Sequence, residues 1–391
     1  MIFNTTFVVK FAKILTMKKL GLVLILCVIF ISCEKKEITH SFCYWKTGWN
    51  DSQQDSLLKK QMNVKHFYLR FFDVDWNPYD KEARPVATFN GNYNPATDVE
   101  MTPSVFITNE VLLNSDKKKL DVLAKNIDKR IDQILDGLTF DKRRDLAYAY
   151  YKKSGKEYSQ KSTDSIIEAE KNNYKIKVKE VLIDCDWSVK SKDNYFYLLK
   201  KLQENKKYQI SATIRLWQYK YYEKSGIPPV DKGLLMCYNL SSPNDKKTEN
   251  SIGTSKELEQ YITHDKYDLP LDVALPIFSW SVVFRGKEFK GIISDERNIN
   301  FKKDTLNFQK INDSKFVFKN DLVIGETYFR NGDEVRIEQI SDAEMQKMIK
   351  RIKSKITLKN DVKITFFSWD HKFINNYGTD KINSYYAQFE R

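Results

Sequence analysis

Two aspartates separated by one residue close an apolar run in the segment EVLIDCDWSVK, which covers positions 180–190. Side chains two apart on a strand share a face, so Asp184 and Asp186 are expected to point the same way, with Leu182 below them. Neighbouring carboxylates repel, so one of them should hold its proton unless a cation such as Arg215 neutralises it. A protonated carboxyl beside an ionised one could perform acid/base chemistry on a glycosidic bond.

The elements that would position these acids are eight apolar runs of strand length. They are rich in Val, Ile, Phe, Tyr and Thr, as strands covered on both faces are. Helical periodicities lie between several of them, for example at Leu120, Leu123, Ile127, Ile131 and Ile134. Eight strands alternating with helices predict an α/β fold, a (β/α)8 TIM barrel. The runs are Ser41–Trp45, Val64–Phe72, Pro103–Thr108, Val178–Asp184, Gln209–Leu216, Gly233–Tyr238, Val273–Trp280 and Val362–Ser368.

Two stretches are too long to be simple connections in such a barrel. Residues about 136–174 are charged and predict a helical insertion after strand 3. Residues about 286–345 contain alternating apolar positions and the turn sequence NGD at Asn331–Asp333, which predict a β-hairpin insertion between strands 7 and 8. The helix Asp342–Lys355 would then precede the last strand. Residues 34–391 are therefore interpreted as a single TIM-barrel domain carrying both insertions.

Polar and aromatic residues gather at the C-terminal ends of these strands, where barrels of this type carry their sites. This clustering predicts a pocket at the barrel mouth. An equally physical alternative is that Asp184–Arg215 and Asp73–Arg70 are salt bridges that only plug the barrel. Besides the two aspartates and Tyr238, the candidate ligand-binding residues are Trp45, Arg70, Asp73, Asn109, Arg215, Gln218, Asn239, Trp280, Trp369 and Asp370.

The tryptophans indicate the class of ligand. Flat aromatic faces stack on the apolar faces of sugar rings, while carboxylates and amides bind hydroxyls. Some of these indoles are instead expected to be core residues with a satisfied N–H. Neither a glycine-rich phosphate loop nor a GxSxG elbow is present, which argues against nucleotide binding and an α/β-hydrolase. Six of the seven tryptophans lie at or just past strand ends, at Trp45, Trp76, Trp187, Trp217, Trp280 and Trp369.

The segment MKKLGLVLILCVIFISC, from Met17 to Cys33, reads as a signal peptide with a basic start and a short apolar stretch. Its end resembles a bacterial lipobox, which predicts lipidation of Cys33 and a membrane anchor in the cell envelope, on the periplasmic side or the cell surface. An ordinary cleaved signal or a signal anchor is the alternative. Residues 1–33 are therefore left out of the fold, and the 16 leading residues are interpreted as an over-called start.

Charge and cysteines exclude other classes. The formal charge is +13, and removal of the first 33 residues, with four lysines and no acids, leaves about +9. The lysines are mixed with acids, which indicates solvated helix faces, and nucleic acid is not expected as a partner. Cys43, Cys185 and Cys237 lie in apolar runs without metal-ligand spacing, so free buried thiols are expected, with no metal and no cofactor.

Three motifs give the chain a family resemblance. IDCDW at Ile183–Trp187, MCYN at Met236–Asn239 and FSWD at Phe367–Asp370 resemble strand signatures of the family 18 glycoside hydrolases, the chitinase-like barrels. The resemblance implies that Asp186 assists the N-acetyl group of a substrate, Tyr238 supports that group and Trp369 forms the floor of a sugar subsite. It also places the chain with uncharacterised, Bacteroidetes-type lipoproteins.

The chain departs from the family pattern at three positions. Ser188 stands at the position of the general acid, Val181 at that of the first aspartate, and Asn239 where the family usually has aspartate. A serine cannot protonate a leaving group near neutral pH. The sequence therefore predicts a lipid-anchored, glycoside hydrolase-like protein that acts on or binds an oligo- or polysaccharide. The alternatives are a non-catalytic glycan-binding lipoprotein and a structural or assembly subunit with a degenerate site.

Overall fold

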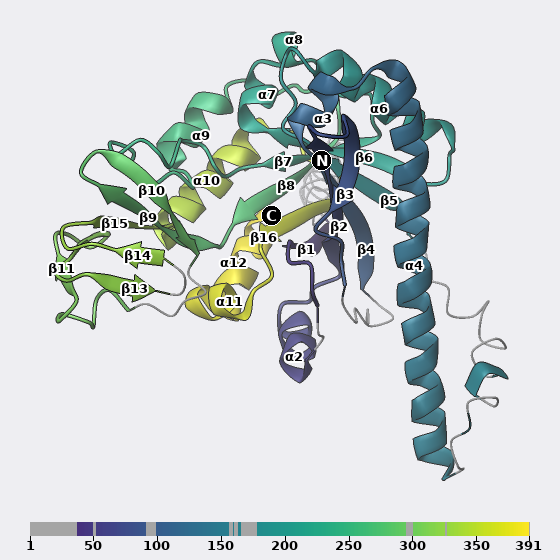
Figure 1. Ribbon diagram of the computed structural model, residues 1–391, viewed down its shortest axis with the longest axis horizontal. Coiled ribbons are helices and arrows are strands. Elements are labelled where there is room, and N and C mark those ends of the chain that lie inside the picture. Colours follow the sequence, from purple (N-terminus) through teal and green to yellow (C-terminus); the bar gives the residue numbers. More distant parts are fainter. Residues whose placement is uncertain are drawn as a thin grey trace, which may run out of the picture.

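The structure is a computed structural model that describes residues 37–49, 52–90, 99–155, 159, 163–165, 178–294, 300–324 and 327–390. Eight parallel strands form a closed ring, because β1 pairs with β16 on one side and with β2 on the other (Figure 1). The predicted TIM barrel is therefore confirmed. In ring order the strands are β1 (Ile38–Tyr44), β2 (His66–Asn77), β4 (Glu100–Ile107), β5 (Glu180–Asp184), β6 (Gln209–Arg215), β7 (Lys232–Met236), β8 (Leu271–Pro276) and β16 (Val362–Phe367).

Two strands differ from their predicted lengths in ways that affect the mouth. Strand β2 continues to Asn77 and turns back into the antiparallel strand β3 (Glu82–Val86), so a hairpin extends the rim. The apolar run predicted as one strand over Val273–Trp280 is two strands, since β8 ends at Pro276 and β9 (Ser279–Arg285) begins a separate sheet. Proline lacks the N–H needed to continue a ladder, so the break falls at a residue suited to it.

Helices cover the outside of the ring, and one of them is very long (Figure 1). The predicted apolar stripe of α4 is buried at Leu120, Ile127 and Ile131, and the helix runs on to the left-handed Gly155. The part of the predicted helical insertion up to Gly155 is thus a continuation of α4, and residues 163–165 are helical as well; the stretches 156–158, 160–162 and 166–177 lie outside the described residues. The helices are α2 (Gln53–Gln61), α3 (Asn109–Asn114), α4 (Lys117–Ser154), α6 (Lys192–Glu204), α7 (Leu216–Lys220), α8 (Tyr222–Ser225), α9 (Ser255–Tyr261), α10 (Asp342–Lys355), α11 (His371–Tyr377) and α12 (Thr379–Phe389).

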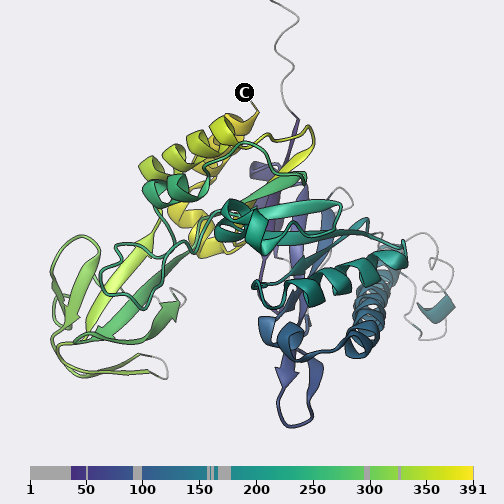
Figure 2. The same ribbon diagram turned by 90° about the horizontal axis from the view of Figure 1, so that it is seen from above.

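The insertion between β8 and β16 is larger than the predicted hairpin. It forms a five-stranded antiparallel sheet with its own apolar core, which projects to one side of the barrel (Figure 2). The NGD turn joins β14 to β15, but these strands pair with β13 and β12 respectively, so the predicted pairing across the turn is wrong. The strands of the insertion are β9, β10 (Glu288–Ser294), β11 (Phe308–Lys310), β12 (Lys315–Phe318), β13 (Leu322–Ile324), β14 (Thr327–Phe329) and β15 (Glu334–Gln339).

The N-terminal end of the barrel interior is closed by buried ion pairs. Asp272 accepts from the Tyr68 hydroxyl at 3.0 Å and pairs with Lys232 at 2.9 Å. Nearby, Lys363 pairs with Glu180 at 2.5 Å. Each of these groups points inward near the start of its strand, so opposite charges and not apolar side chains fill the base of the ring.

Three further expectations concern the chain as a whole. Cys43, Cys185 and Cys237 are free and buried, as predicted. In the described ranges no helix is both long enough and apolar enough to span a bilayer; Met17–Cys33 lies outside them. The same ranges hold no group of three or more His, Cys, Asp or Glu side chains arranged to hold a metal ion.

Candidate functional site

A cavity of about 240 Å³ opens at the C-terminal end of the barrel, and is called the mouth cavity here. Its lining comes from seven of the eight barrel strands or from residues just past their ends. It unites many candidate residues that lie far apart in sequence, including both aspartates of the opening motif. The lining residues are Cys43, Trp45, Arg70, Asp73, Phe106, Leu182, Asp184, Asp186, Thr213, Arg215, Leu234, Met236, Tyr238, Asn239 and Phe367.

Asp184 is the most deeply placed carboxyl of this cavity. Its residue is 6% exposed, and the Thr213 hydroxyl donates to Oδ1 at 2.6 Å. Burial raises the pKa of Asp184 to about 6, with the charges of Asp186 and Asp73 adding to the rise and Thr213 and Arg215 opposing it. Burial, and not the repulsion from Asp186 on which the prediction rested, is the main cause of this shift.

The two arginines of the cavity each hold one carboxylate in a two-bond contact. Arg215 binds Asp186 through Nε and through Nη2, the latter at 2.5 Å from Oδ2, so Asp186 and not Asp184 is its ion-pair partner. Arg70 donates from Nε to Asp73 at 2.7 Å and through Nη2 to the second oxygen. Its Nη1 also donates to the Trp45 carbonyl at 3.1 Å. These pairs fix two walls of the cavity.

Tyr238 provides a hydroxyl of a different kind. The residue is 5% exposed, lines the mouth cavity and makes no hydrogen bond within the described part of the chain. Its ring packs against Phe367 and Phe278, with centroids 5.2 and 5.9 Å away, and burial raises its pKa well above the usual range. A neutral phenol that has no protein partner can bond a ligand at no cost to the protein's own contacts.

Trp369 does not line the mouth cavity but the β1 side of the barrel, so its predicted place as the floor of a sugar subsite in the central cavity is not supported and stays a prediction. Its indole lies outside the ring, against Phe42 and Phe67, and donates to Asp55 Oδ1 at 2.8 Å. Phe367, the last residue of β16, contributes the aromatic face instead. The chain leaves the strand after Phe367, so the two-residue rule no longer predicts where Trp369 points.

Asp370 also turns away from the mouth cavity. Its carboxylate caps α11 through the Lys372 N–H at 2.9 Å and pairs with Lys46 at 2.7 Å. Gln218 is fully buried and ties together two strand ends, accepting from the Arg215 N–H and donating to the Trp187 carbonyl. Its predicted contact with a ligand is therefore not supported either and stays a prediction.

Asn109 and Trp280 are likewise occupied elsewhere. Asn109 accepts from the Ser191 hydroxyl, and the Trp280 indole donates to Glu338 at 2.7 Å in the inserted sheet. Ser188, at the position of the family's general acid, lies in the same network as Asn109, since its N–H donates to Ser191 Oγ at 2.9 Å. None of these three residues lines the mouth cavity.

The sequence analysis missed Thr213 and Phe367. Thr213 lies two residues before Arg215 on β6, so the alternation that gave Arg215 also placed Thr213 inward. Phe367 belongs to the FSWD motif, but the candidate residues predicted from that motif were Trp369 and Asp370. In both cases, the alternation of inward and outward side chains along the strand could have identified the residue.

Two further hollows, each of a volume similar to that of the mouth cavity, lie beside it. The β6 hollow, about 290 Å³, shares Asp186, Arg215, Tyr238 and Asn239 with it and adds Leu216, Trp217, Leu240 and Tyr261. The β1 hollow, about 230 Å³, is lined by Tyr44, Lys46, Trp49, Asp55, Trp369, Asp370 and His371.

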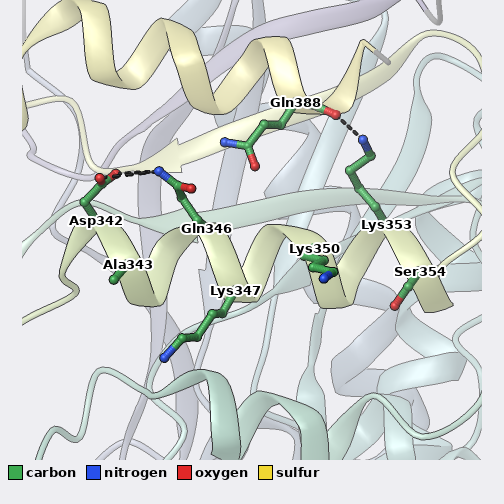
Figure 3. A pocket seen from close by; sticks show the side chains of 8 residues that line it. All are labelled: Asp342, Ala343, Gln346, Lys347, Lys350, Lys353, Ser354 and Gln388. Atoms are coloured by element: carbon green, nitrogen blue, oxygen red, sulfur yellow. Dashed lines mark hydrogen bonds between the residues drawn. The ribbon is translucent and has the colours of Figure 1, made fainter.

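Two more hollows lie away from the mouth. The larger, about 790 Å³, runs between α10 and α12 and is lined by polar and charged side chains such as Lys347 and Lys350 (Figure 3). The other, about 340 Å³, lies beside α4 and includes Lys118 and Val122. Both lack aromatic lining residues, which distinguishes them from the three hollows of the mouth.

Comparison with known proteins gives a structural likeness alone. No family model and no curated protein matches the chain. The spore cortex-lytic enzyme SleL of Bacillus megaterium is 12% identical, with a TM-score of 0.48 over 91% of this chain and 75% of that one. The family 18 chitinase ChiB of Flavobacterium johnsoniae is 11% identical, with a TM-score of 0.44 over 90% and 94%. A family 113 β-1,4-mannanase is 9% identical, with a TM-score of 0.38 over 89% and 97%.

Proposed function

We propose that the chain binds a carbohydrate at the mouth cavity and does not cleave it. The observation that carries this proposal is the chemistry of the lining. Trp45, Phe367 and Tyr238 offer aromatic surfaces, while Asp184 and Asn239 offer polar atoms for hydroxyl groups. Sugar rings present both kinds of surface at once, and the cavity is close to the lower limit of volumes typical of ligand sites.

The engagement of the other two carboxylates of the lining by arginines argues for binding over catalysis. Asp73 and Asp186 are each held by an arginine in two contacts, so neither carboxylate is free to face a substrate without giving up those bonds. Ser188 cannot replace the family's general acid, and it contacts Ser191 outside the cavity. A glycosidase needs one carboxyl that donates a proton and a second that acts opposite it.

One observation favours a second candidate, hydrolysis of a glycosidic bond with Asp184 as the acid. The pKa of Asp184 is raised to about 6, in the range where a carboxyl can donate a proton near neutral pH. Its buried position and its bond to Thr213 place it below the cavity walls and not at the rim. Both candidates use the same cavity and differ only in whether products form.

A glycan array with the domain covering residues 34–391 tests the proposal, followed by product analysis on every glycan that binds. We expect binding without products for the wild type, and weakened binding for Asp186→Asn because Arg215 loses its partner. Products that disappear in Asp184→Asn would establish the hydrolase instead. No binding to any glycan would reject both candidates.

The lipid anchor and the envelope location are separate proposals that rest on the sequence. Met17–Cys33 combines two lysines, an apolar stretch and a terminal cysteine. We expect a clickable palmitate analogue to label the wild-type protein, and Cys33→Ala to lose both the label and the membrane fraction. Labelling that persists in the variant would reject Cys33 as the lipidated residue. Membership in the Bacteroidetes-type lipoprotein group stays a prediction.

A further inference from the structure

The β1 hollow shares no lining residue with the mouth cavity. We infer that it forms the outer subsite for a linear oligosaccharide, which crosses the barrel mouth from the β6 hollow through the mouth cavity. This inference rests on the proposed function and adds the size and shape of the ligand. It is supported by the position of the hollows, their common chemistry and the contacts of His371.

Strand order puts the two flanking hollows on opposite sides of the ring. Four steps lead from β1 to β6 in either direction, through β2, β4 and β5 or through β16, β8 and β7. The β6 hollow is lined by residues at the ends of β5, β6 and β7. The β1 hollow is lined by residues past the ends of β1 and β16, together with Asp55 of α2. The mouth cavity takes lining residues from both β1 and β6, so it lies between the two flanking hollows.

The mouth cavity shares or adjoins lining residues with both neighbours. Asp186 and Arg215 stand in the wall it shares with the β6 hollow. On the other side, Trp45 lines the mouth cavity while its chain neighbours Tyr44 and Lys46 line the β1 hollow. The mouth cavity and the β1 hollow are therefore lined by consecutive residues at the end of β1.

All three hollows combine tryptophan with charged side chains. Trp217 lies in the β6 hollow, Trp45 in the mouth cavity, and Trp49 with Trp369 in the β1 hollow. The hollows beside α10 and α4 contain lysines and acids but no aromatic residue. Repetition of the same mixed lining in adjoining hollows suits a polymer whose successive units present similar faces, such as a chain of sugars.

The polar groups of the β1 hollow match hydroxyl groups. Asp55 accepts from the Ser52 N–H at 2.9 Å and from the Trp369 indole at 2.8 Å. Burial alone would raise the pKa of Asp55, but hydrogen bonds from Ser52, Trp369 and His371 lower it, so it is the ionised acceptor of the cluster.

His371 is held by that carboxylate on one side only. Its Nε2 lies 2.7 Å from Asp55 Oδ1, which assigns the proton of the neutral ring to Nε2 and leaves Nδ1 as an acceptor. Nδ1 has no hydrogen-bond partner among residues of the described ranges, and the side chain is 34% exposed. An acceptor at Nδ1 can receive a sugar hydroxyl.

Charges in the β1 hollow also disfavour an anionic ligand. Lys46 pairs with Asp370 at 2.7 Å, and Asp55 adds a further negative charge. A phosphate would therefore meet two carboxylates and one lysine. A neutral ligand with many hydroxyls can use the donors and acceptors of both pairs without adding charge.

The test is calorimetric titration with β-1,4-linked N-acetylglucosamine oligomers from dimer to hexamer, and with a parallel cello-oligosaccharide ladder. The proteins are the wild-type domain, His371→Ala, Lys46→Ala and the control Lys347→Ala in the hollow between α10 and α12. For at least one ladder we expect wild-type affinity to rise with chain length. We expect His371→Ala and Lys46→Ala to lower hexamer affinity by about tenfold and leave dimer affinity unchanged. Lys347→Ala should behave as the wild type.

The outcomes separate this inference from the proposed function. If the wild type binds dimer and hexamer equally well, or both variants bind the hexamer as the wild type does, the outer subsite is rejected while carbohydrate binding stands. If no oligomer of either ladder binds, the inference fails, and the glycan array decides the proposed function on its own. Lys46 is half exposed at its side chain, so Lys46→Ala keeps the test valid if His371→Ala fails to fold.

Discussion

At the N-terminal end of the barrel interior, Asp272 is enclosed by Tyr68, Lys232 and Lys363. At the C-terminal end, Asp184 is also buried, but the hydroxyl of Thr213 is its direct hydrogen-bond donor. The first arrangement neutralises a carboxylate and closes the base of the ring. The second leaves a carboxyl with a pKa near 6 beside an open cavity. Within one barrel, full pairing therefore marks the structural end and incomplete pairing marks the candidate site.

Tyrosines repeat the contrast between the two ends. The Tyr68 hydroxyl donates to Asp272 at the base, whereas the Tyr238 hydroxyl at the mouth has no protein partner within the described residues. Both residues are buried. Because the Tyr238 hydroxyl borders the mouth cavity, a ligand in that cavity can bond it without displacing a protein partner.

The largest expected effect on stability comes from removing a charge from the ion pairs at the N-terminal end of the barrel interior. Asp272→Asn should lower the free energy of unfolding by about 3–5 kcal/mol, because it leaves buried Lys232 and Lys363 without a full counter-charge. Urea unfolding followed by circular dichroism measures the loss. Asp186→Asn at the mouth is the matched control; its side chain is 41% exposed, so the expected loss is at most about 1 kcal/mol. Equal losses for both variants would contradict the assignment of structural and functional ends.

Asp184 should make stability depend on pH. The folded chain holds this proton more tightly than the unfolded chain, since the pKa is about 6 against 3.8. Stability therefore falls as pH rises from about 4 to about 6, by about 3 kcal/mol in total. Unfolding at a series of pH values measures this slope, and Asp184→Asn should abolish it. In Asp186→Asn the pH range over which stability falls should become narrower, because the charge of Asp186 helps to raise the pKa of Asp184.

The two tyrosines offer a smaller, matched comparison. Tyr68→Phe removes a hydrogen bond to a buried carboxylate and should cost about 1.5–3 kcal/mol of stability. Tyr238→Phe removes a hydroxyl without a protein partner and should leave stability within about 0.5 kcal/mol of the wild type. Thermal unfolding of both variants compares them. A large loss for Tyr238→Phe would mean that its hydroxyl serves the fold.

The smallest expected effect concerns ligand affinity. Tyr238→Phe should weaken binding of an array-selected glycan by about five- to tenfold, the value of one lost hydrogen bond. Calorimetric titration measures it. Tyr195→Phe is the control, because the Tyr195 hydroxyl donates to the Ile183 carbonyl outside the cavity. A reduction in Tyr195→Phe as large as in Tyr238→Phe would indicate an effect through the fold and not through the site.

The barrel was predictable because buried parallel strands appear in the sequence as apolar runs of strand length that alternate with helical periodicities. The shared inward face of Asp184 and Asp186 followed from alternation along β5. The predicted run ending at Trp280 failed because two strands, separated after Pro276, read as one in the sequence. Composition cannot show that break, since both strands are apolar.

The ion pairs of the site were harder to predict than its members. Arg215 ends β6, the strand beside β5, so the sequence alone could pair it with either Asp184 or Asp186. The structure shows that its partner is Asp186. Trp369 and Asp370 follow the end of β16, where backbone direction is set by contacts with Cys43 and α11 and no longer by strand alternation. Residues inside strands were therefore placed well, and residues past strand ends were placed poorly.

Binding of a sugar chain at the barrel mouth is tested most directly by a crystal structure of the domain with the array-selected oligosaccharide. The account predicts a sugar ring in the mouth cavity, with a hydroxyl or carbonyl oxygen within hydrogen-bond distance of Tyr238 Oη and further units toward Trp217 and His371. An oligosaccharide seated only on another surface, such as the groove between α10 and α12, would contradict it.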